Sequence, residues 1–288
     1  MIESFLVTSR ETLEASLVVG IVFAYLNKTN NQDYKKTAYY GIVFGILASI
    51  LAGFIFTFLA GNFEGAAQKI FEGATMLIGA FLLTTMILWM MQQRHISKDI
   101  EGKVEMHLHN SQPFFSHFGI FMVIFMAIIR EGVETVIFLN AINYANGINF
   151  ISGTLGIIAA IVAGYLFFVT TKKINLKKLF NISSVLLILF AAGLVAHGIH
   201  ELEEANVVNG IISPLFNLNP AANADGSFPL MHEYGIIGGF LKGLFGYSPD
   251  PSLLEVIAYF AYLAIIFVLY KRIGKNQFSK KLIFSKFL

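Results

Sequence analysis

Two short stretches of the chain each place an arginine and two glutamates inside a largely apolar segment. The first is R-E-T-L-E at residues 10–14, and the second is R-E-G-V-E at residues 130–134, between the apolar runs 118–129 and 135–139. In each copy the two glutamates are three residues apart, so they share one face of a helix. Carboxylate oxygens are hard ligands that suit hard cations. If the two faces meet, four carboxylates surround one space, contributed by Glu11, Glu14, Glu131 and Glu134.

Charged side chains within apolar segments of this length are expected to do more than stabilise a helix, because they are costly to place in a membrane. A charged side chain at mid-bilayer costs roughly 2.5–3.5 kcal/mol on insertion scales, and intramembrane charges default to a functional role. Arg10 and Arg130 directly precede the glutamate pairs and can offset the repulsion among the carboxylates. The alternative is that each arginine only pairs with a glutamate one turn away, but buried ion pairs are weak devices for stability. A cation pathway supported by both arginines is the favoured interpretation.

The composition indicates a membrane protein. Of the 288 residues 56% are hydrophobic and only 13% are charged, whereas soluble domains carry roughly 25% charged residues. Cysteine is absent, which excludes disulfides and thiolate metal sites. The first residues lack the basic region of a cleavable signal, so we expect the first apolar segment to be retained. The basic tail at 271–286 fits anionic lipid and membrane orientation better than nucleic acid.

The hydropathy pattern predicts an all-α polytopic membrane protein that forms one domain over residues 1–288. Sixteen of the twenty Lys and Arg residues fall on one side of the predicted spans, and only Lys69 and Lys242 fall in segments on the other side. By the positive-inside rule the N-terminus is outside and the C-terminus is in the cytoplasm. Segment 92–113 is predicted to be a cytoplasmic loop, and segment 202–252, rich in Pro and Gly, an outer loop. The seven predicted transmembrane helices are 2–26, 37–60, 69–91, 114–144, 151–171, 179–201 and 253–272.

The chain also repeats itself. The R-E-x-x-E motif recurs at an offset of 120, residues 50–54 match 161–165 at an offset of 111, and 69–71 match 178–180 at an offset of 109. Each repeat, about 1–92 and about 114–204, holds three spans, an odd number, so the two have opposite orientations. Inverted repeats are typical of transporters and place the site at their interface. The seventh helix lies outside the repeats. Close helix packing is predicted at Gly41, Gly45, Gly53, Gly156 and Gly164.

A second polar cluster lies at residues 197–204, at the end of the sixth predicted span. His200, Glu201 and Glu204 follow steps that keep them on one helical face. Imidazole together with carboxylate suits iron, zinc or manganese. The functional interpretation is an outer metal-capture site, and the alternative is a polar helix end that meets water.

Two R-E-x-x-E helices in a seven-span protein with its N-terminus outside resemble the oxidase-dependent iron permease family, whose bacterial members are the EfeU-type permeases. The resemblance covers Met1 to about Arg272. It implies a transporter rather than an enzyme, located in the cytoplasmic (inner or plasma) membrane, with iron as transported substrate and no cofactor. The iron ligands implied by the resemblance are Glu11, Glu14, Glu131 and Glu134.

The resemblance also bears on partners. Some family members carry a large extracytoplasmic domain before the first span, and the fungal branch works beside a multicopper ferroxidase. We expect this chain to lack such a domain, so the resemblance implies capture by the outer loops, an extracytoplasmic ferroxidase or an iron-delivery protein. The residues are equally compatible with ferrous and ferric iron, with or without proton coupling, and with a monomer or an oligomer.

Rival functions are a transporter of another cation, such as manganese or calcium, and a membrane di-metal oxidase. The oxidase is disfavoured because the motifs lack the Glu-x-x-His signature of di-iron oxidases. A receptor or scaffold would leave the charges unexplained.

Overall fold

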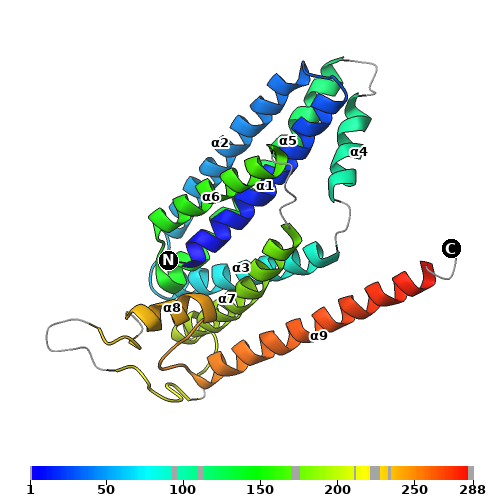
Figure 1. The fold of residues 1–288 in the computed structure, drawn as a ribbon. Coiled ribbons are helices and arrows are strands. Elements are labelled where there is room, and N and C mark those ends of the chain that lie inside the picture. The colour runs from blue at the N-terminus through cyan, green and yellow to red at the C-terminus, as the bar shows by residue number, and fades with distance from the viewer. Residues whose placement is uncertain are drawn as a thin grey trace. The chain divides into compact units, whose positions relative to one another are not determined.

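The computed structural model describes residues 2–92, 96–108, 113–169, 176–210, 212–220, 228–232 and 235–284. Within these ranges the chain is helical and contains no strand (Figure 1). The predicted all-α class is therefore confirmed for the part of the chain that is described. The helices are α1 (Ile2–Lys28), α2 (Tyr34–Ala60), α3 (Ala66–Gln92), α4 (Ile96–Leu108), α5 (Pro113–Asn146), α6 (Phe150–Val169), α7 (Leu176–Glu204), α8 (Ile236–Phe245) and α9 (Leu253–Phe284).

Five of these helices are long and apolar enough to cross a membrane. The qualifying segments are Tyr34–Ala60, Ala66–Met90, Phe150–Phe168, Ile182–Glu204 and Leu253–Arg272. Helices α1 and α5, with 27 and 34 residues, also have the length of a span at 1.5 Å per residue. They are the two helices that carry the R-E-x-x-E charges. The chain is thus a helical, multi-pass membrane protein, and each predicted span corresponds to a helix.

Two helices lie where connections were expected. Segment 92–113 was predicted as a loop, but it contains α4, whose Val104 is fully buried in a core with residues of α1 and α5. The loop prediction was wrong because the apolar residues of this segment are separated by charged and polar ones, so its average hydropathy is low. Ile100, Val104 and Leu108 nevertheless recur at intervals of four and form one face of a helix. Similarly, α8 lies within the segment 202–252 that was expected to be mostly loop.

Local sequence signals explain where α8 and α9 end or begin. Ser252 and Glu255 form a capping box at the start of α9. The Ser252 N–H donates to Glu255 Oε1 at 3.0 Å, and the Glu255 N–H donates to Ser252 Oγ at 3.1 Å. Gly246 ends α8 with a φ of 65°, a left-handed conformation that favours glycine.

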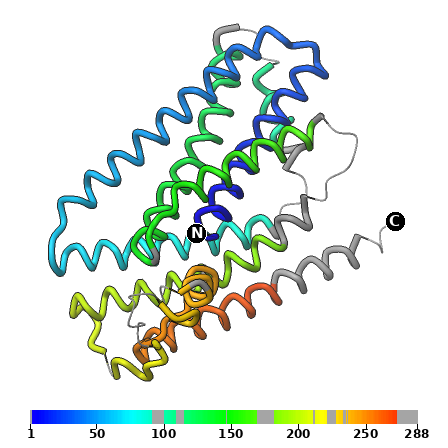
Figure 2. Tube along the Cα trace, turned by 60° about the vertical axis from the view of Figure 1, so that its left-hand side comes forward, coloured from blue at the N-terminus to red at the C-terminus, as the bar shows by residue number. Residues whose placement is uncertain are grey.

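The chain forms two compact units. The first contains Met1–Glu64 and Arg94–Ser183, and the second contains Gly65–Gln93 and Ser184–Leu288. In the first unit α1 packs against α6 and α5, and α2 packs against α5 (Figures 1 and 2). Both R-E-x-x-E helices therefore belong to the first unit. The second unit holds α3, α8, α9 and most of α7, and with them the polar cluster at the end of α7.

Glycines allow the helices of the first unit to approach closely, as predicted. A Cβ atom added at Gly45 of α2 would lie 2.9 Å from the Cβ of Ile128 on α5. At Gly156 of α6 it would lie 2.6 Å from the carbonyl oxygen of Phe5 on α1. Such close backbone approach holds α1 and α5 firmly between their partners, so that the charged side chains are positioned by a packed bundle.

Helix crossings in the second unit also depend on small residues. A Cβ atom added at Gly73 of α3 would lie 2.8 Å from the carbonyl oxygen of Gly198 on α7. The hydroxyl groups of Thr84 and Tyr262 form a hydrogen bond of 2.6 Å between α3 and α9. The approach of Gly73 to Gly198 places the end of α7, where the polar cluster lies, against α3.

Candidate functional site

Helices α1 and α5 bring three of the four predicted glutamates together. Glu11 of α1 and Glu131 and Glu134 of α5 each offer a carboxylate oxygen, and these oxygens all lie within 4.8 Å of one another. The residues Glu11 and Glu131 are 1% and 6% exposed. Oxygens on opposite sides of an ion held at roughly 2.0–2.6 Å are about 4–5 Å apart. The spacing of the three carboxylates therefore fits a single cation.

Each arginine pairs with the glutamate one helical turn further along. Arg10 Nε donates to Glu14 Oε1 at 3.2 Å, and Arg130 Nε donates to Glu134 Oε1 at 3.0 Å. Arg130 Nε also lies 3.7 Å from Glu131 Oε1. Glu14, the fourth predicted ligand, thus interacts with Arg10 and is not one of the three carboxylates that converge.

Several oxygens at this cluster have no hydrogen-bond donor. Both carboxylate oxygens of Glu11 and Oε2 of Glu131 are buried and lack a hydrogen-bond partner among the residues that the structure describes. Buried polar atoms are nearly always hydrogen-bonded, and leaving one unpaired costs about 1–3 kcal/mol. Converging acceptors without donors are the arrangement that a cation would complete.

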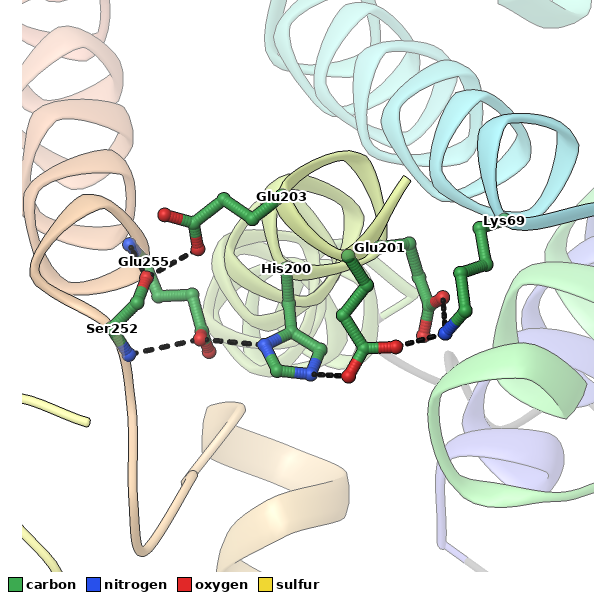
Figure 3. A network of polar contacts seen from close by, with 7 residues as sticks. Lys69, His200, Glu201, Glu203, Ser252 and Glu255 are labelled. Atoms are coloured by element: carbon green, nitrogen blue, oxygen red, sulfur yellow. Dashed lines mark hydrogen bonds and ion pairs between the residues drawn. The ribbon is translucent and has the colours of Figure 1, made fainter. Parts of the chain in front are cut away.

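The second polar cluster lies at the junction of α7 and α9 (Figure 3). His200 and Glu203 of α7 and Glu255 of α9 each offer a ligand atom, and these atoms lie within 4.8 Å of one another. His200 Nδ1 lies 2.9 Å from Glu255 Oε1, and Nε2 lies 3.3 Å from Glu204 Oε1. An imidazole and two carboxylates at this spacing can also hold a metal ion.

The structure groups these residues differently from the prediction. His200, Glu201 and Glu204 were expected to act together, but Glu201 and Glu204 both face Lys69 of α3. Lys69 Nζ is 3.7 Å from Glu201 Oε2 and closer still to Glu204 Oε2. Only His200 of the predicted set belongs to the group formed with Glu203 and Glu255.

Two of the residues that meet His200 were missed although the sequence contained signals for them. Ser252 and Glu255 form an S-x-x-E pattern directly before an apolar run, which is the signature of a capping box. That pattern locates the start of α9 and its first charged residue. Glu203 follows His200 by three residues and shares its helical face as well as Glu204 does. The sequence did not indicate that the start of α9 lies beside the end of α7.

These observations define the class of the protein: a multi-pass helical membrane protein with a carboxylate cluster buried between two of its long helices. Comparison with known protein families identifies one family over nearly the whole chain. The model of the iron permease FTR1 family matches residues 1–275, and the chain belongs to this family. The resemblance that the doubled R-E-x-x-E motif indicated is therefore confirmed.

Individual relatives align along nearly the whole chain. An uncharacterized protein of Archaeoglobus fulgidus is 33% identical over 273 residues, which is 94% of this chain and 95% of the relative. The ferrous iron permease EfeU of Yersinia pestis is 30% identical over 276 residues, 94% of this chain and 93% of the relative. EfeU of Escherichia coli is 28% identical over 282 residues, 95% of this chain and 98% of the relative. No solved structure matches the chain.

Proposed function

We propose that the protein imports iron as Fe²⁺ across the cytoplasmic membrane and binds the ion at Glu11, Glu131 and Glu134, with Glu14 beside them. The observation that carries the proposal is the convergence of three carboxylates within 4.8 Å. The buried oxygens that lack a donor add to it. The relatives named ferrous iron permease support iron as the cargo.

The charge of the cluster favours a divalent ion. Four glutamates and two arginines give a net charge of −2 when all six are ionised. A bound Fe²⁺ would balance that charge, whereas Fe³⁺ would leave one positive charge in a buried position. Uncompensated buried charge is strongly unfavourable.

We further propose that the site lies between two inverted repeats, because equivalent contacts recur in the first unit. Gly45 of α2 faces Ile128 of α5, and Gly156 of α6 faces Thr8 of α1. The glycines differ by the repeat offset of 111 and their partners by the repeat offset of 120. Thus the second helix of each repeat packs on the first helix of the other, as a two-fold relation requires. The same relation holds for Gly53 with Val136 and Gly164 with Ser16.

In the proposed mechanism the repeats expose the site alternately to the two sides of the membrane. The N-terminus is outside, and all seven long apolar or charged helices span the bilayer. While no ion is bound, Arg10 and Arg130 hold Glu14 and Glu134. An entering cation competes for these carboxylates and loosens the arginine contacts. The inside-negative potential favours entry by ~2.3 kcal/mol per charge per 100 mV. A ferroxidase or iron-delivery partner stays a prediction.

Uptake of radioactive Fe²⁺ under reducing conditions into vesicles that contain the purified protein tests this proposal. Glu11→Gln and Glu134→Gln should each lower uptake at least tenfold, because each removes a charged ligand while keeping the shape of the side chain. Glu64→Gln is the matched control, since Glu64 is exposed in the connection between α2 and α3. It should retain uptake within twofold.

Two outcomes would overturn the proposal. Normal uptake by both variants, with protein inserted in the vesicles, would show that the carboxylate cluster is not needed for transport. Accumulation of Mn²⁺ or Ca²⁺ but not of iron would show that iron is not the transported ion. Rapid oxygen consumption by the protein with Fe²⁺ and no transport would instead favour the membrane oxidase.

A further inference from the structure

We propose that His200, Glu203 and Glu255 form a second metal site, which binds a divalent first-row transition-metal ion at the junction of α7 and α9. The three residues supply one imidazole nitrogen and two carboxylate oxygens, all within 4.8 Å of one another (Figure 3). This mixed donor set suits ions such as Fe²⁺, Mn²⁺ or Zn²⁺ better than Ca²⁺ or Mg²⁺, which prefer oxygen alone. The His200 side chain is 42% exposed, so an ion can reach it.

The carboxylates of this group are held as metal-binding carboxylates usually are. Ligating carboxylates are themselves hydrogen-bonded to neighbouring groups that fix their orientation. The Ser252 N–H donates to Glu255 Oε1 at 3.0 Å, and the Ser252 hydroxyl donates to Glu203 Oε2 at 2.5 Å. The other oxygen of Glu203 is buried and has no hydrogen-bond partner within the described part of the chain. One serine thus orients both carboxylates of the group.

The imidazole is held in the same way. A metal-binding histidine typically donates its other ring N–H to a carboxylate, which fixes the ring and its tautomer. His200 Nε2 lies 3.3 Å from Glu204 Oε1, and Glu204 is in turn paired with Lys69. Nδ1 then faces Glu255 at 2.9 Å. An ion bound at the site would take the place of this direct contact between Nδ1 and Glu255.

A purely structural role explains less of the arrangement. The capping box accounts for Ser252 and Glu255, and ion pairing accounts for Glu204 and Lys69. Neither accounts for the convergence of a ligand atom of Glu203 with those of His200 and Glu255. A shared ion would account for the convergence of these three side chains.

The second site is separate from the carboxylate cluster of α1 and α5. It belongs to the other compact unit and shares no residue with that cluster. It lies at the C-terminal end of the segment Ile182–Glu204 and at the N-terminal end of Leu253–Arg272, hence at one surface of the membrane. On the proposed orientation this is the outer surface, where an ion would be held before transport. Only this assignment of side rests on the proposed function.

Binding of Mn²⁺, measured by electron paramagnetic resonance, tests the second site on the purified full-length protein in detergent. The parent for the experiment is the triple variant Glu11→Gln/Glu131→Gln/Glu134→Gln, in which the first cluster has lost its charges. We expect the parent to bind one Mn²⁺ per chain. Adding His200→Gln or Glu203→Gln should weaken binding at least tenfold. Glu201→Gln, on the same turn of α7, is the control and should change affinity less than twofold.

The proposal is overturned if the triple variant binds no Mn²⁺, or if both His200→Gln and Glu203→Gln bind it as their parent does. Size-exclusion profiles show whether each variant is folded. If His200→Gln aggregates, Glu203→Gln decides, because glutamine keeps an oxygen that can accept from Ser252. Failure of the proposed transport would leave Mn²⁺ binding by the triple variant intact, so the two proposals fail separately.

Discussion

Two substitutions in neighbouring turns of α1 should shift the stability of the protein in opposite directions. Glu11→Gln removes a carboxylate that faces other carboxylates, whereas Glu14→Gln removes the partner of a buried arginine. Glutamine is nearly isosteric with glutamate, so the charge is the main change in both variants. The structure therefore predicts that Glu11→Gln stabilises the metal-free protein and that Glu14→Gln destabilises it.

The expected gain for Glu11→Gln follows from the distances. Its oxygens lie within 4.8 Å of oxygens of Glu131 and Glu134. At an effective dielectric constant of about 20, two unit charges 4.8 Å apart repel by about 3 kcal/mol. Two such neighbours give about 7 kcal/mol before any compensation by the arginines. The nearby arginines offset part of this repulsion, so we expect Glu11→Gln to raise the free energy of unfolding by about 1–3 kcal/mol.

The expected loss for Glu14→Gln follows from burial. The Arg10 side chain is 1% exposed and that of Glu14 is 12% exposed, so water cannot replace the lost carboxylate. Breaking a buried ion pair by removing one partner costs about 3–5 kcal/mol. A glutamine oxygen can still accept the hydrogen bond from Arg10 Nε. We therefore expect the free energy of unfolding to fall by about 2–3 kcal/mol.

Denaturant unfolding of the purified protein in detergent, with a chelator present, measures both effects. Adding Mn²⁺ at a hundredfold excess over its dissociation constant should stabilise the wild type by about 2.7 kcal/mol per site. Glu11→Gln should not gain the stabilisation that Mn²⁺ gives at the α1–α5 cluster. Its higher free energy of unfolding relative to the wild type should therefore shrink when Mn²⁺ is present. The reasoning is refuted if both variants shift in the same direction, or if Glu11→Gln is the less stable of the two.

Two further predictions concern the charged motif and the packing. Arg10→Lys should lower iron uptake more than Arg130→Lys. The Arg10 side chain is 1% exposed and that of Arg130 is 48% exposed, so only a lysine at position 130 has room to change its conformation. Equal uptake by both variants would contradict this prediction. Gly156→Leu should abolish correctly folded protein in the membrane, because its Cβ would lie 2.6 Å from the carbonyl oxygen of Phe5. Gly102→Ala in α4, where a Cβ meets nothing within 4 Å, should leave expression unchanged or higher, and size-exclusion chromatography of both variants checks the pair.

The parts of the molecule that depend on local sequence could be predicted. Long apolar runs predicted long helices, five of which are long and apolar enough to cross a membrane, since a span must satisfy its backbone hydrogen bonds within the helix itself. The pairing of Arg10 with Glu14 follows from a spacing of four residues, which is one helical turn. The doubled motif led us to expect four carboxylates around one space, and the structure brings together three of them, Glu11, Glu131 and Glu134, while Glu14 pairs with Arg10.

Features that depend on which helix lies beside which could not be predicted. Nothing local to residue 255 says that it meets His200, because the residues are 55 positions apart and belong to different helices. The face of α7 was likewise ambiguous, since Glu201, Glu203 and Glu204 all lie within one turn of His200. In the structure Glu201 and Glu204 both pair with Lys69, Glu204 also lies 3.3 Å from His200 Nε2, and Glu203 accepts a hydrogen bond from Ser252.

The two copies of R-E-x-x-E are alike in sequence but not in surroundings, and this difference bears on transport. The Arg10 side chain is buried, whereas that of Arg130 is 48% exposed, although each makes the same ion pair one turn along its helix. If inverted repeats exchange conformations during transport, each copy takes on the surroundings of the other. The second state would then bury Arg130 and expose Arg10. A site whose two arginines alternate in this way could release an ion on one side without ever leaving all four carboxylates unpaired.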